Sequence, residues 1–132
     1  MGDAMVDGAR KAQAMAYAPY SKFRVGAALE AVSGTVYYGC NVENASYGLT
    51  VCAERAAVAA AVLDGAHRFR RLVVTTDVDP PASPCGACRQ MLAEFGLDLE
   101  IEAVGPSQQR QWTLRDLLPD AFRSDRLPQR DL

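Results

Sequence analysis

Two short cysteine segments constrain this chain most strongly, because they must meet in the fold if they bind one metal ion. The first is Cys52-Ala53-Glu54, and the second is Pro84-Cys85-Gly86-Ala87-Cys88. A C-x-x-C pair offers two thiolates to one ion, and Cys52 is the natural third ligand. Water then takes the fourth corner of the tetrahedron, as in a catalytic zinc site. A C-x-x-C pair alone fits a redox motif or half of a structural zinc site equally well.

Both cysteine segments are predicted to begin helices. Residues 53–63 are rich in alanine and end at Asp64-Gly65, and residues 86–95 stop at Gly96. A helix N-terminus favours the thiolate form of a cysteine. Three thiolates leave a zinc site at a formal charge of −1, which the helix termini and Arg55 can offset. Glu54, in the first helical turn, can lean over the open coordination position and transfer protons.

The other periodic segments predict an α/β sandwich around a mixed sheet. We find no repeat or linker, so residues 1–132 are expected to form a single domain with a polar, loose tail from about residue 123. The helix over 53–63 is apolar nearly all round, which predicts burial on most sides and hints at a subunit interface. The remaining elements are a helix over 4–16, a hairpin of 25–32 and 35–42, strands over 71–76 and 97–104, and a short strand with a helical turn within 111–118.

Composition and charge exclude several classes of protein. The net charge is −2, and the sequence has no basic stripe that would follow the backbone of a nucleic-acid polymer. No apolar run approaches the ~20 residues that span a bilayer, and the first residues lack the hydrophobic region of a signal peptide. We therefore expect a cytoplasmic protein with no membrane partner, whose cysteines stay reduced.

The cysteine segments and their neighbours resemble the short, homotetrameric cytidine deaminases. Three cysteine ligands, a glutamate that does not bind the metal and a P-C-x-x-C run are typical of zinc nucleobase deaminases. The resemblance implies a three-layer αβα sandwich with a five-stranded mixed sheet, a Zn²⁺ cofactor, and a homotetramer whose active sites are shared between subunits. It is carried by residues 18–29, 39–55, 84–90 and 117–122.

The same resemblance implies a role for each candidate site residue. Taken alone, Asn41 and Glu43 also fit polar residues at a strand end, Phe23 fits a core aromatic, and Arg55 fits a surface position, although beside Cys52 we favour its burial. His67 is the only histidine, so a His-Cys-Cys ligand set is excluded. The implied roles are zinc binding by Cys52, Cys85 and Cys88, proton transfer by Glu54, substrate binding by Phe23, Asn41, Glu43, Ala53 and Phe122, and moderation of thiolate charge by Arg55, with Asn41 and Glu43 on the ribose 3′-hydroxyl and Phe122 reaching a neighbouring subunit.

The expected reaction is hydrolytic deamination of free cytidine and 2′-deoxycytidine to uridine and 2′-deoxyuridine, with release of ammonia, in pyrimidine salvage. It would proceed through zinc-bound hydroxide with Glu54 as the proton shuttle. The carboxylate of Glu43 would repel a phosphate, which favours a nucleoside over a nucleotide. Three alternatives stay open: a deaminase of a cytosine-containing antibiotic of the blasticidin type, a polynucleotide-editing deaminase, and a non-catalytic zinc-binding module.

Overall fold

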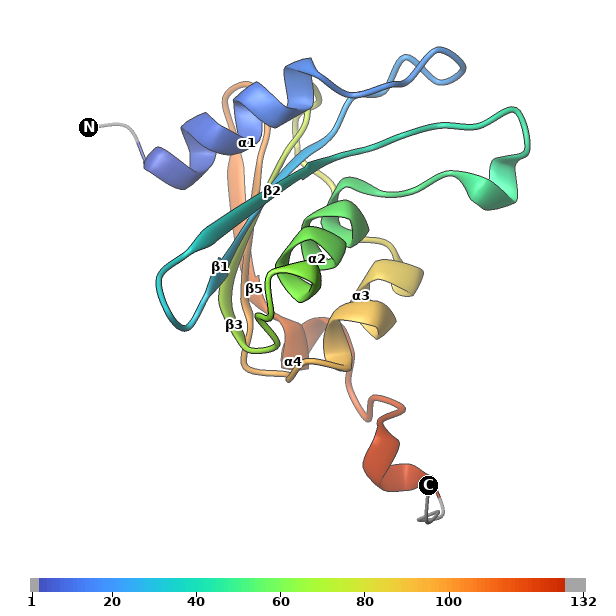
Figure 1. The fold of residues 1–132 in the computed structure, drawn as a ribbon. Coiled ribbons are helices and arrows are strands. Elements are labelled where there is room, and N and C mark those ends of the chain that lie inside the picture. The colour runs from blue at the N-terminus through green and yellow to red at the C-terminus, as the bar shows by residue number, and fades with distance from the viewer. Residues whose placement is uncertain (1–2, 128–132) are drawn as a thin grey trace.

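One mixed sheet organises the part of the chain described by the computed structural model, residues 3–127 (Figure 1). The strand order is β2-β1-β3-β4-β5, with β3 and β4 parallel and the other neighbours antiparallel. Helices lie on both faces, so the expected three-layer αβα sandwich with a five-stranded mixed sheet is confirmed. The strands are β1 (Gly26–Ala31), β2 (Val36–Cys40), β3 (Phe69–Thr75), β4 (Glu100–Val104) and β5 (Gln109–Thr113).

The two faces of the sheet carry separate apolar layers. Helix α1 (Ala4–Ala14) buries Met5 and Ala9 against Ala28 and Val73 on one face. Helices α2 (Ala53–Leu63) and α3 (Gly86–Ala93) cover the opposite face (Figure 1), where Leu29, Leu72 and Ile101 are fully buried. Alternate residues of a strand point to opposite faces, so β1 and β3 each supply both layers.

Two glycines let helices approach the first hairpin closely. A Cβ atom on Gly26 would lie 2.0 Å from the carbonyl oxygen of Ala9 in α1. A Cβ atom on Gly39 would lie 2.4 Å from the carbonyl oxygen of Ala53, the first residue of α2. The start of β1 and the end of β2 are therefore pressed between the two helices, and this fixes the start of α2 relative to the sheet.

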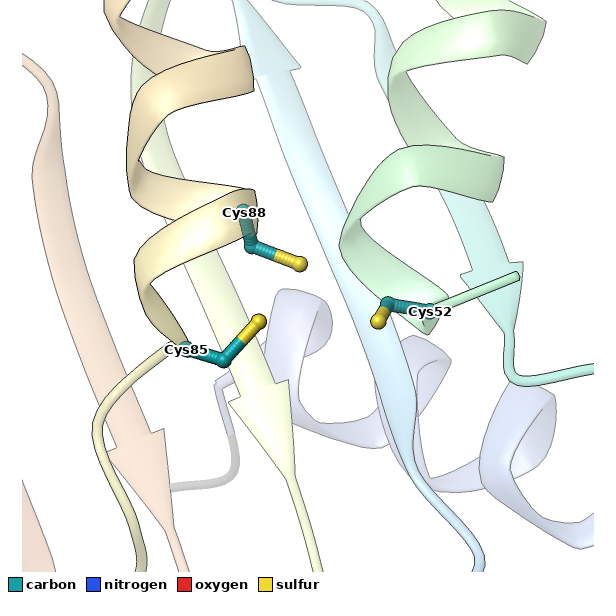
Figure 2. A group of neighbouring side chains, drawn as sticks. All are labelled: Cys52, Cys85 and Cys88. Atoms are coloured by element: carbon teal, nitrogen blue, oxygen red, sulfur yellow. The ribbon is translucent and has the colours of Figure 1, made fainter. Parts of the chain in front are cut away.

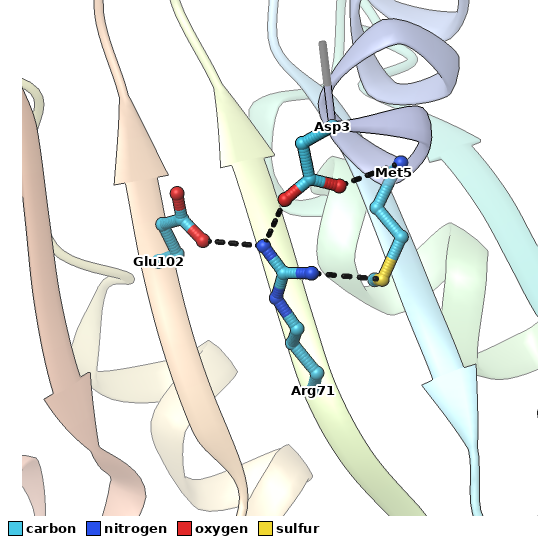
Figure 3. Close-up of polar contacts among 4 residues, drawn as sticks. All are labelled: Asp3, Met5, Arg71 and Glu102. Atoms are coloured by element: carbon cyan, nitrogen blue, oxygen red, sulfur yellow. Dashed lines mark hydrogen bonds and ion pairs between the residues drawn. The ribbon is translucent and has the colours of Figure 1, made fainter. Parts of the chain in front are cut away.

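An ionic cluster anchors the beginning of α1 to the central strands. Arg71 of β3 donates to the carboxylates of Asp3 and Glu102, at 2.6 Å for Glu102, and its second terminal nitrogen contacts the Met5 sulfur at 3.7 Å (Figure 3). Asp3 also caps α1 by accepting from the Met5 amide at 3.0 Å. These contacts hold the pKa of Asp3 below its usual range, chiefly through the Arg71 hydrogen bond.

The predicted elements all occur, with some shifted bounds. The strand expected over 97–104 begins only at Glu100, because the carbonyls of Leu97 and Leu99 accept from Arg115 and Leu114 at the start of α4 (Leu114–Leu117). The expectation that the alanine-rich helix is buried on most sides is wrong for the single chain, since Val62 is 39% and Leu63 is 91% exposed.

Short 3-10 turns complete the described chain. One spans Tyr47–Leu49 and the other spans Ser124–Arg126 within the tail that was expected to be loose. The remainder of that tail, residues 128–132, lies outside the described residues. Among residues 3–127, no helix has both the length and the apolar character needed to cross a membrane.

Candidate metal centre and substrate pocket

The topology brings two helix starts to the same edge of the sheet. Because β3 and β4 are parallel, their carboxyl ends lie together, and α2 and α3 each run back from that edge into the strand that follows. This edge is where open α/β sheets usually bind ligands. Cys52 is the N-cap residue of α2, Cys85 is the N-cap residue of α3, and Cys88 lies in the first turn of α3.

The three cysteines meet at this edge (Figure 2). The Sγ atoms of Cys52, Cys85 and Cys88 all lie within 4.8 Å of one another. A zinc–sulfur bond of about 2.3 Å places the sulfurs of a tetrahedral site about 3.8 Å apart, so small side-chain adjustments close the group around one ion. Thiolates are soft ligands that select zinc over hard cations such as magnesium. The donor set therefore fits zinc.

The thiols already interact with one another. The pKa of Cys52 is lowered to about 6, chiefly because Cys88 hydrogen-bonds to its sulfur. The same contact, together with burial, raises the pKa of Cys88. The lowered pKa of Cys52 favours its thiolate form, and Cys52 lies at the positive end of α2, where a helix N-terminus favours an anion.

Glu54 places a carboxyl group beside the cysteines. It lies in the first turn of α2, is 6% exposed, and lines a cavity together with Cys52 and Cys85. Burial raises the pKa of Glu54 above its usual range. A carboxyl group that holds and releases its proton closer to neutral pH is well suited to general acid and base catalysis.

The cavity has a volume of about 310 Å³, within the size range of small-molecule sites. Irregular chain before β1, after β2, before α2 and before α3 supplies most of its lining, and the carboxyl end of β3 and the start of α2 supply the rest. Of the expected substrate-binding residues, Phe23, Asn41 and Ala53 line it. The remaining lining residues are Val25, Thr50, Val74, Thr76, Ala82, Ser83 and Pro84.

Asn41 holds the wall that carries Phe23. Its Nδ2 donates to the Phe23 carbonyl at 2.8 Å, and its Oδ1 accepts from the Val25 amide at 2.9 Å. Asn41 is 8% exposed, and one Nδ2 hydrogen is left for another acceptor. The side chain therefore shapes the cavity as well as lining it.

Glu43 lies in an adjoining recess rather than in the main cavity. Its carboxylate accepts from the amides of Tyr20 and Ser21 at 3.0 and 3.1 Å, and from the Ser21 hydroxyl. These bonds, the Ser21 hydroxyl first, lower the pKa of Glu43. Thr50 lines both the recess and the cavity, so the two spaces are neighbours.

Comparison with known proteins identifies the family. Residues 3–101 match the family model for the cytidine and deoxycytidylate deaminase zinc-binding region. The chain is 47% identical over 128 residues to a cytidine deaminase of Sporosarcina psychrophila, covering 89% of this chain and 88% of the relative. It is 48% identical over 120 residues to that of Mycobacterium tuberculosis, covering 91% and 88%.

This chain belongs to the cytidine and deoxycytidylate deaminase family. Its fold also matches the crystal structure of a cytidine deaminase from Burkholderia pseudomallei, with a TM-score of 0.87, 46% identity, and coverage of 92% of this chain and all of that chain. Family and donor set both identify zinc as the metal, which confirms the expected cofactor and the expectation of a zinc-dependent enzyme.

Besides Glu43, Arg55 and Phe122 of this deaminase also lie outside the cavity in the single chain. Arg55 is exposed, so the burial that we favoured from the sequence is wrong here, although its charge contributes to the lowered pKa of Cys52. Phe122 is 60% exposed and its ring does not line the cavity. Its backbone carbonyl accepts a hydrogen bond from Nε2 of Gln90 in α3 at 2.7 Å, which holds the C-terminal segment around Phe122 beside the helix that carries Cys88.

Sequence reasoning missed several residues that support the site. Gln13 is 5% exposed, and its Nε2 donates to the Asp77 carboxylate at 2.9 Å and to the Arg24 carbonyl at 3.3 Å. A glutamine between alanines gives no signal of burial. Arg89 follows Cys88 directly and donates hydrogen bonds to Ser83 and Pro84, which line the cavity. Its place in the second cysteine segment was the one available signal.

Proposed function

We propose that this chain catalyses hydrolytic deamination of free cytidine and 2′-deoxycytidine, giving uridine or 2′-deoxyuridine and ammonia. The observation that carries the proposal is the position of Glu54, a buried carboxyl group beside a three-cysteine metal centre in one cavity. Membership of the deaminase family, over residues 3–101, supports the same reaction.

Cys52, Cys85 and Cys88 hold the metal in this proposal, and one coordination position stays open. When bound, zinc acts as a Lewis acid that activates water for attack on a ring carbon. The starts of α2 and α3 face the thiolates with their positive ends. Arg55 adds a nearby positive charge, so it moderates the negative charge of the ligand set.

Glu54 moves two protons. Its carboxylate accepts a proton from the attacking water and delivers it to ring N3, which makes C4 more electrophilic as the new C–O bond forms. It then carries the proton of the C4 hydroxyl to the amine, the C4–N bond breaks, and ammonia leaves. The N3 proton stays in the uracil product. The raised pKa of Glu54 suits a group that must both accept and donate.

The substrate is recognised by residues of the cavity and its adjoining recess. Phe23 and Ala53 contact the base, and Asn41 and Glu43 bind the ribose 3′-hydroxyl, Asn41 through the Nδ2 hydrogen that Phe23 leaves free. The lowered pKa of Glu43 keeps its carboxylate charged. A charged carboxylate at the sugar disfavours a phosphorylated substrate, so a free nucleoside is favoured over a nucleotide or a polynucleotide.

The proposal includes a homotetramer of single-domain subunits spanning residues 1–132. Large apolar side chains are exposed on α2, on the 3-10 turn Tyr47–Leu49 and on the C-terminal segment. Burial between subunits would remove these side chains from water. Phe122 then reaches the site of a neighbouring subunit. The exposed side chains are Leu63 at 91%, Tyr47 at 79%, Leu49 at 66% and Phe122 at 60%. Thiolate ligands stay reduced in the cytoplasm, which is compatible with pyrimidine salvage there.

The test mixes the zinc-loaded protein with cytidine and follows both the ultraviolet band of cytosine and the release of ammonia. A Glu54→Ala variant serves as the control. Matched loss of the cytosine band and gain of ammonia, absent in the variant, is the expected result. A folded, zinc-loaded protein that converts neither cytidine nor deoxycytidine contradicts the proposal, and a cytosine-containing antibiotic would be the next substrate class to assay.

A further inference from the structure

The segment over residues 77–85, whose last four residues line the cavity, has few hydrogen-bond donors of its own. It contains no helix or strand, and Pro80, Pro81 and Pro84 lack amide hydrogens. At its start, Asp77 accepts from Gln13, and Asp79 accepts from Ser107 and Gln108. The end of the segment leads directly into Cys85, so whatever holds this end also places a metal ligand.

Arg89 supplies the donors that the end of this wall lacks. Its Nε donates to the Pro84 carbonyl at 2.7 Å, and one terminal nitrogen donates to the Ser83 hydroxyl at 2.6 Å. The other terminal nitrogen donates to the Leu117 carbonyl at the end of α4, at 2.8 Å. Three separate acceptors are satisfied by one planar, rigid fork, a geometry that lysine lacks.

We infer that Arg89 is a positioning residue for the metal centre. Its side chain fixes the Cys85–Cys88 pair by donating hydrogen bonds to Ser83 and Pro84, which precede the pair. Pro84 immediately precedes Cys85, and Arg89 immediately follows Cys88, so the bond from the Arg89 side chain to the Pro84 carbonyl closes a loop that contains both ligands. All three acceptors are neutral oxygens of the loop and helix end. Arg89 therefore acts through geometry, in contrast to Arg55, which acts through charge.

The same helix ties the metal ligands to the C-terminal segment. Arg89 binds the Leu117 carbonyl, and the next residue, Gln90, binds the Phe122 carbonyl. Two hydrogen bonds from α3 therefore hold residues 117–122 against the helix that carries Cys88. This inference rests on the zinc site of the proposed function, but its test measures zinc release, which does not depend on which substrate is converted.

The experiment uses the full-length zinc-loaded protein and two substitutions of Arg89. Arg89→Met keeps the aliphatic stem and removes every donor, whereas Arg89→Lys keeps the charge. Zinc transfer to a chromogenic chelator is timed well below the unfolding temperature. We expect release about 10- to 100-fold faster for Arg89→Met, the range typical of lost outer-sphere support. Arg89→Lys should show most of that loss, because an ammonium group cannot span the three acceptors.

A matched control and an independent variant keep the inference testable. Arg115→Met removes an exposed arginine of α4 that pairs with Asp98. This substitution should leave zinc release unchanged. Ser83→Ala removes one acceptor of Arg89 and should speed zinc release several-fold when it is the only substitution. Added to Arg89→Met in a double variant, it should have no further effect. This variant decides the matter if Arg89→Met does not fold. The intensity of the sulfur-to-cobalt bands in Co²⁺-substituted protein gives a second measure of ligand geometry.

Three results would overturn the inference. Arg89→Met that lowers only the unfolding temperature, with zinc release and cobalt spectrum unchanged, would show a general structural role. Additive effects of Ser83→Ala and Arg89→Met would show that they do not act through one contact. Equal acceleration by Arg115→Met would show that any arginine loss weakens the site. A protein that binds zinc tightly without converting cytidine would contradict the proposed function and leave these measurements intact.

Discussion

The metal half and the recognition half of the site are built differently. Cys52, Glu54 and Cys88 lie at or within the first turns of two regular helices that are packed against the sheet. Phe23 and Glu43 lie on irregular chain, and they hold their positions through side-chain contacts with backbone. Groups on helices are placed more accurately than groups on loops. The half that performs the chemistry therefore has the stiffer support.

The difference predicts which kinetic constant each half controls. Changes in the metal half should lower kcat, because they alter groups that act only during the reaction. Changes in the recognition half should raise KM and leave kcat close to the wild-type value. Variants that keep zinc fully bound make this comparison measurable.

The largest effect is expected for Glu54→Gln. The amide keeps the size of the side chain but cannot accept and return a proton, so kcat should fall by about 10²- to 10⁴-fold, the usual contribution of general acid–base catalysis. Zinc content should be unchanged, because Glu54 is not among the clustered ligands. Turnover and bound metal are measured on the same preparation. Glu94→Gln, an exposed carboxylate that follows α3, is the control. An active Glu54→Gln enzyme with full zinc would break the comparison.

A second large effect is expected for Asn41→Ala in the recognition half. The substitution removes the partners of the Phe23 carbonyl and the Val25 amide and the proposed ribose contact. Each lost contact of a buried polar group costs about 1–3 kcal/mol, so KM should rise about 10- to 100-fold while kcat changes little. Steady-state kinetics with cytidine test this. A fall in kcat with unchanged KM would show that Asn41 serves the metal half instead.

The metal half could largely be predicted from the sequence, and the recognition half only in part. The alanine-rich run and its closing Gly65 define α2 from Ala53 to Leu63, and the spacing of the cysteines places the ligands at two helix starts. Local sequence cannot show that the Asn41 side chain donates a hydrogen bond to the backbone carbonyl of Phe23. That contact joins residues 18 positions apart and depends on how β1 and β2 enter the sheet.

Exposure was the other property that the sequence did not predict. Arg55 and the apolar side chains of Val62 and Leu63 are exposed in the single chain, although the pattern favoured burial. In the proposed homotetramer, neighbouring subunits would bury such residues, and periodicity within one helix does not describe contacts of that kind. Gln13 is the opposite case, since a polar side chain is buried because Arg10 on its own helix and Arg24 and Asp77 elsewhere in the chain satisfy it.

A smaller effect is expected for Gln13→Met, which sharpens the comparison because Gln13 does not line the cavity. The variant loses the hydrogen bonds to Arg24 and Asp77, which weakens the attachment of the Phe23 segment to α1, although Arg24 still donates to the Ala14 carbonyl at 3.4 Å. The bond to the neutral Arg24 carbonyl contributes about 0.5–1.5 kcal/mol and the bond to the Asp77 carboxylate about 1.5–3 kcal/mol. Part of this loss reaches the substrate-binding wall, so KM should rise about 2- to 10-fold at constant kcat. Gln111→Met, an exposed change on β5, should alter neither constant. A KM equal to the wild type would show that Gln13 does not help to hold the wall.

The smallest effect concerns pH and the anchoring of the recognition half through Glu43. Hydrogen bonds from Ser21 and Tyr20 lower the pKa of Glu43 below its ordinary value of 4.5. The folded state therefore binds this proton less tightly than the unfolded state. The resulting stability is fully present above pH 4.5 and is lost as the pH falls through the lowered pKa of the folded protein.

Glu43→Gln removes this titration, so it tests the sign directly. The difference in unfolding temperature between wild type and variant should be greatest near neutral pH and should shrink towards pH 3. Zinc-free protein must be used throughout, because acid also protonates the thiolate ligands and releases the metal. A difference that stays constant down to pH 3 would mean that shape, rather than carboxylate charge, anchors this segment. In that case the recognition half would be less dependent on its polar contacts than the comparison with the metal half requires.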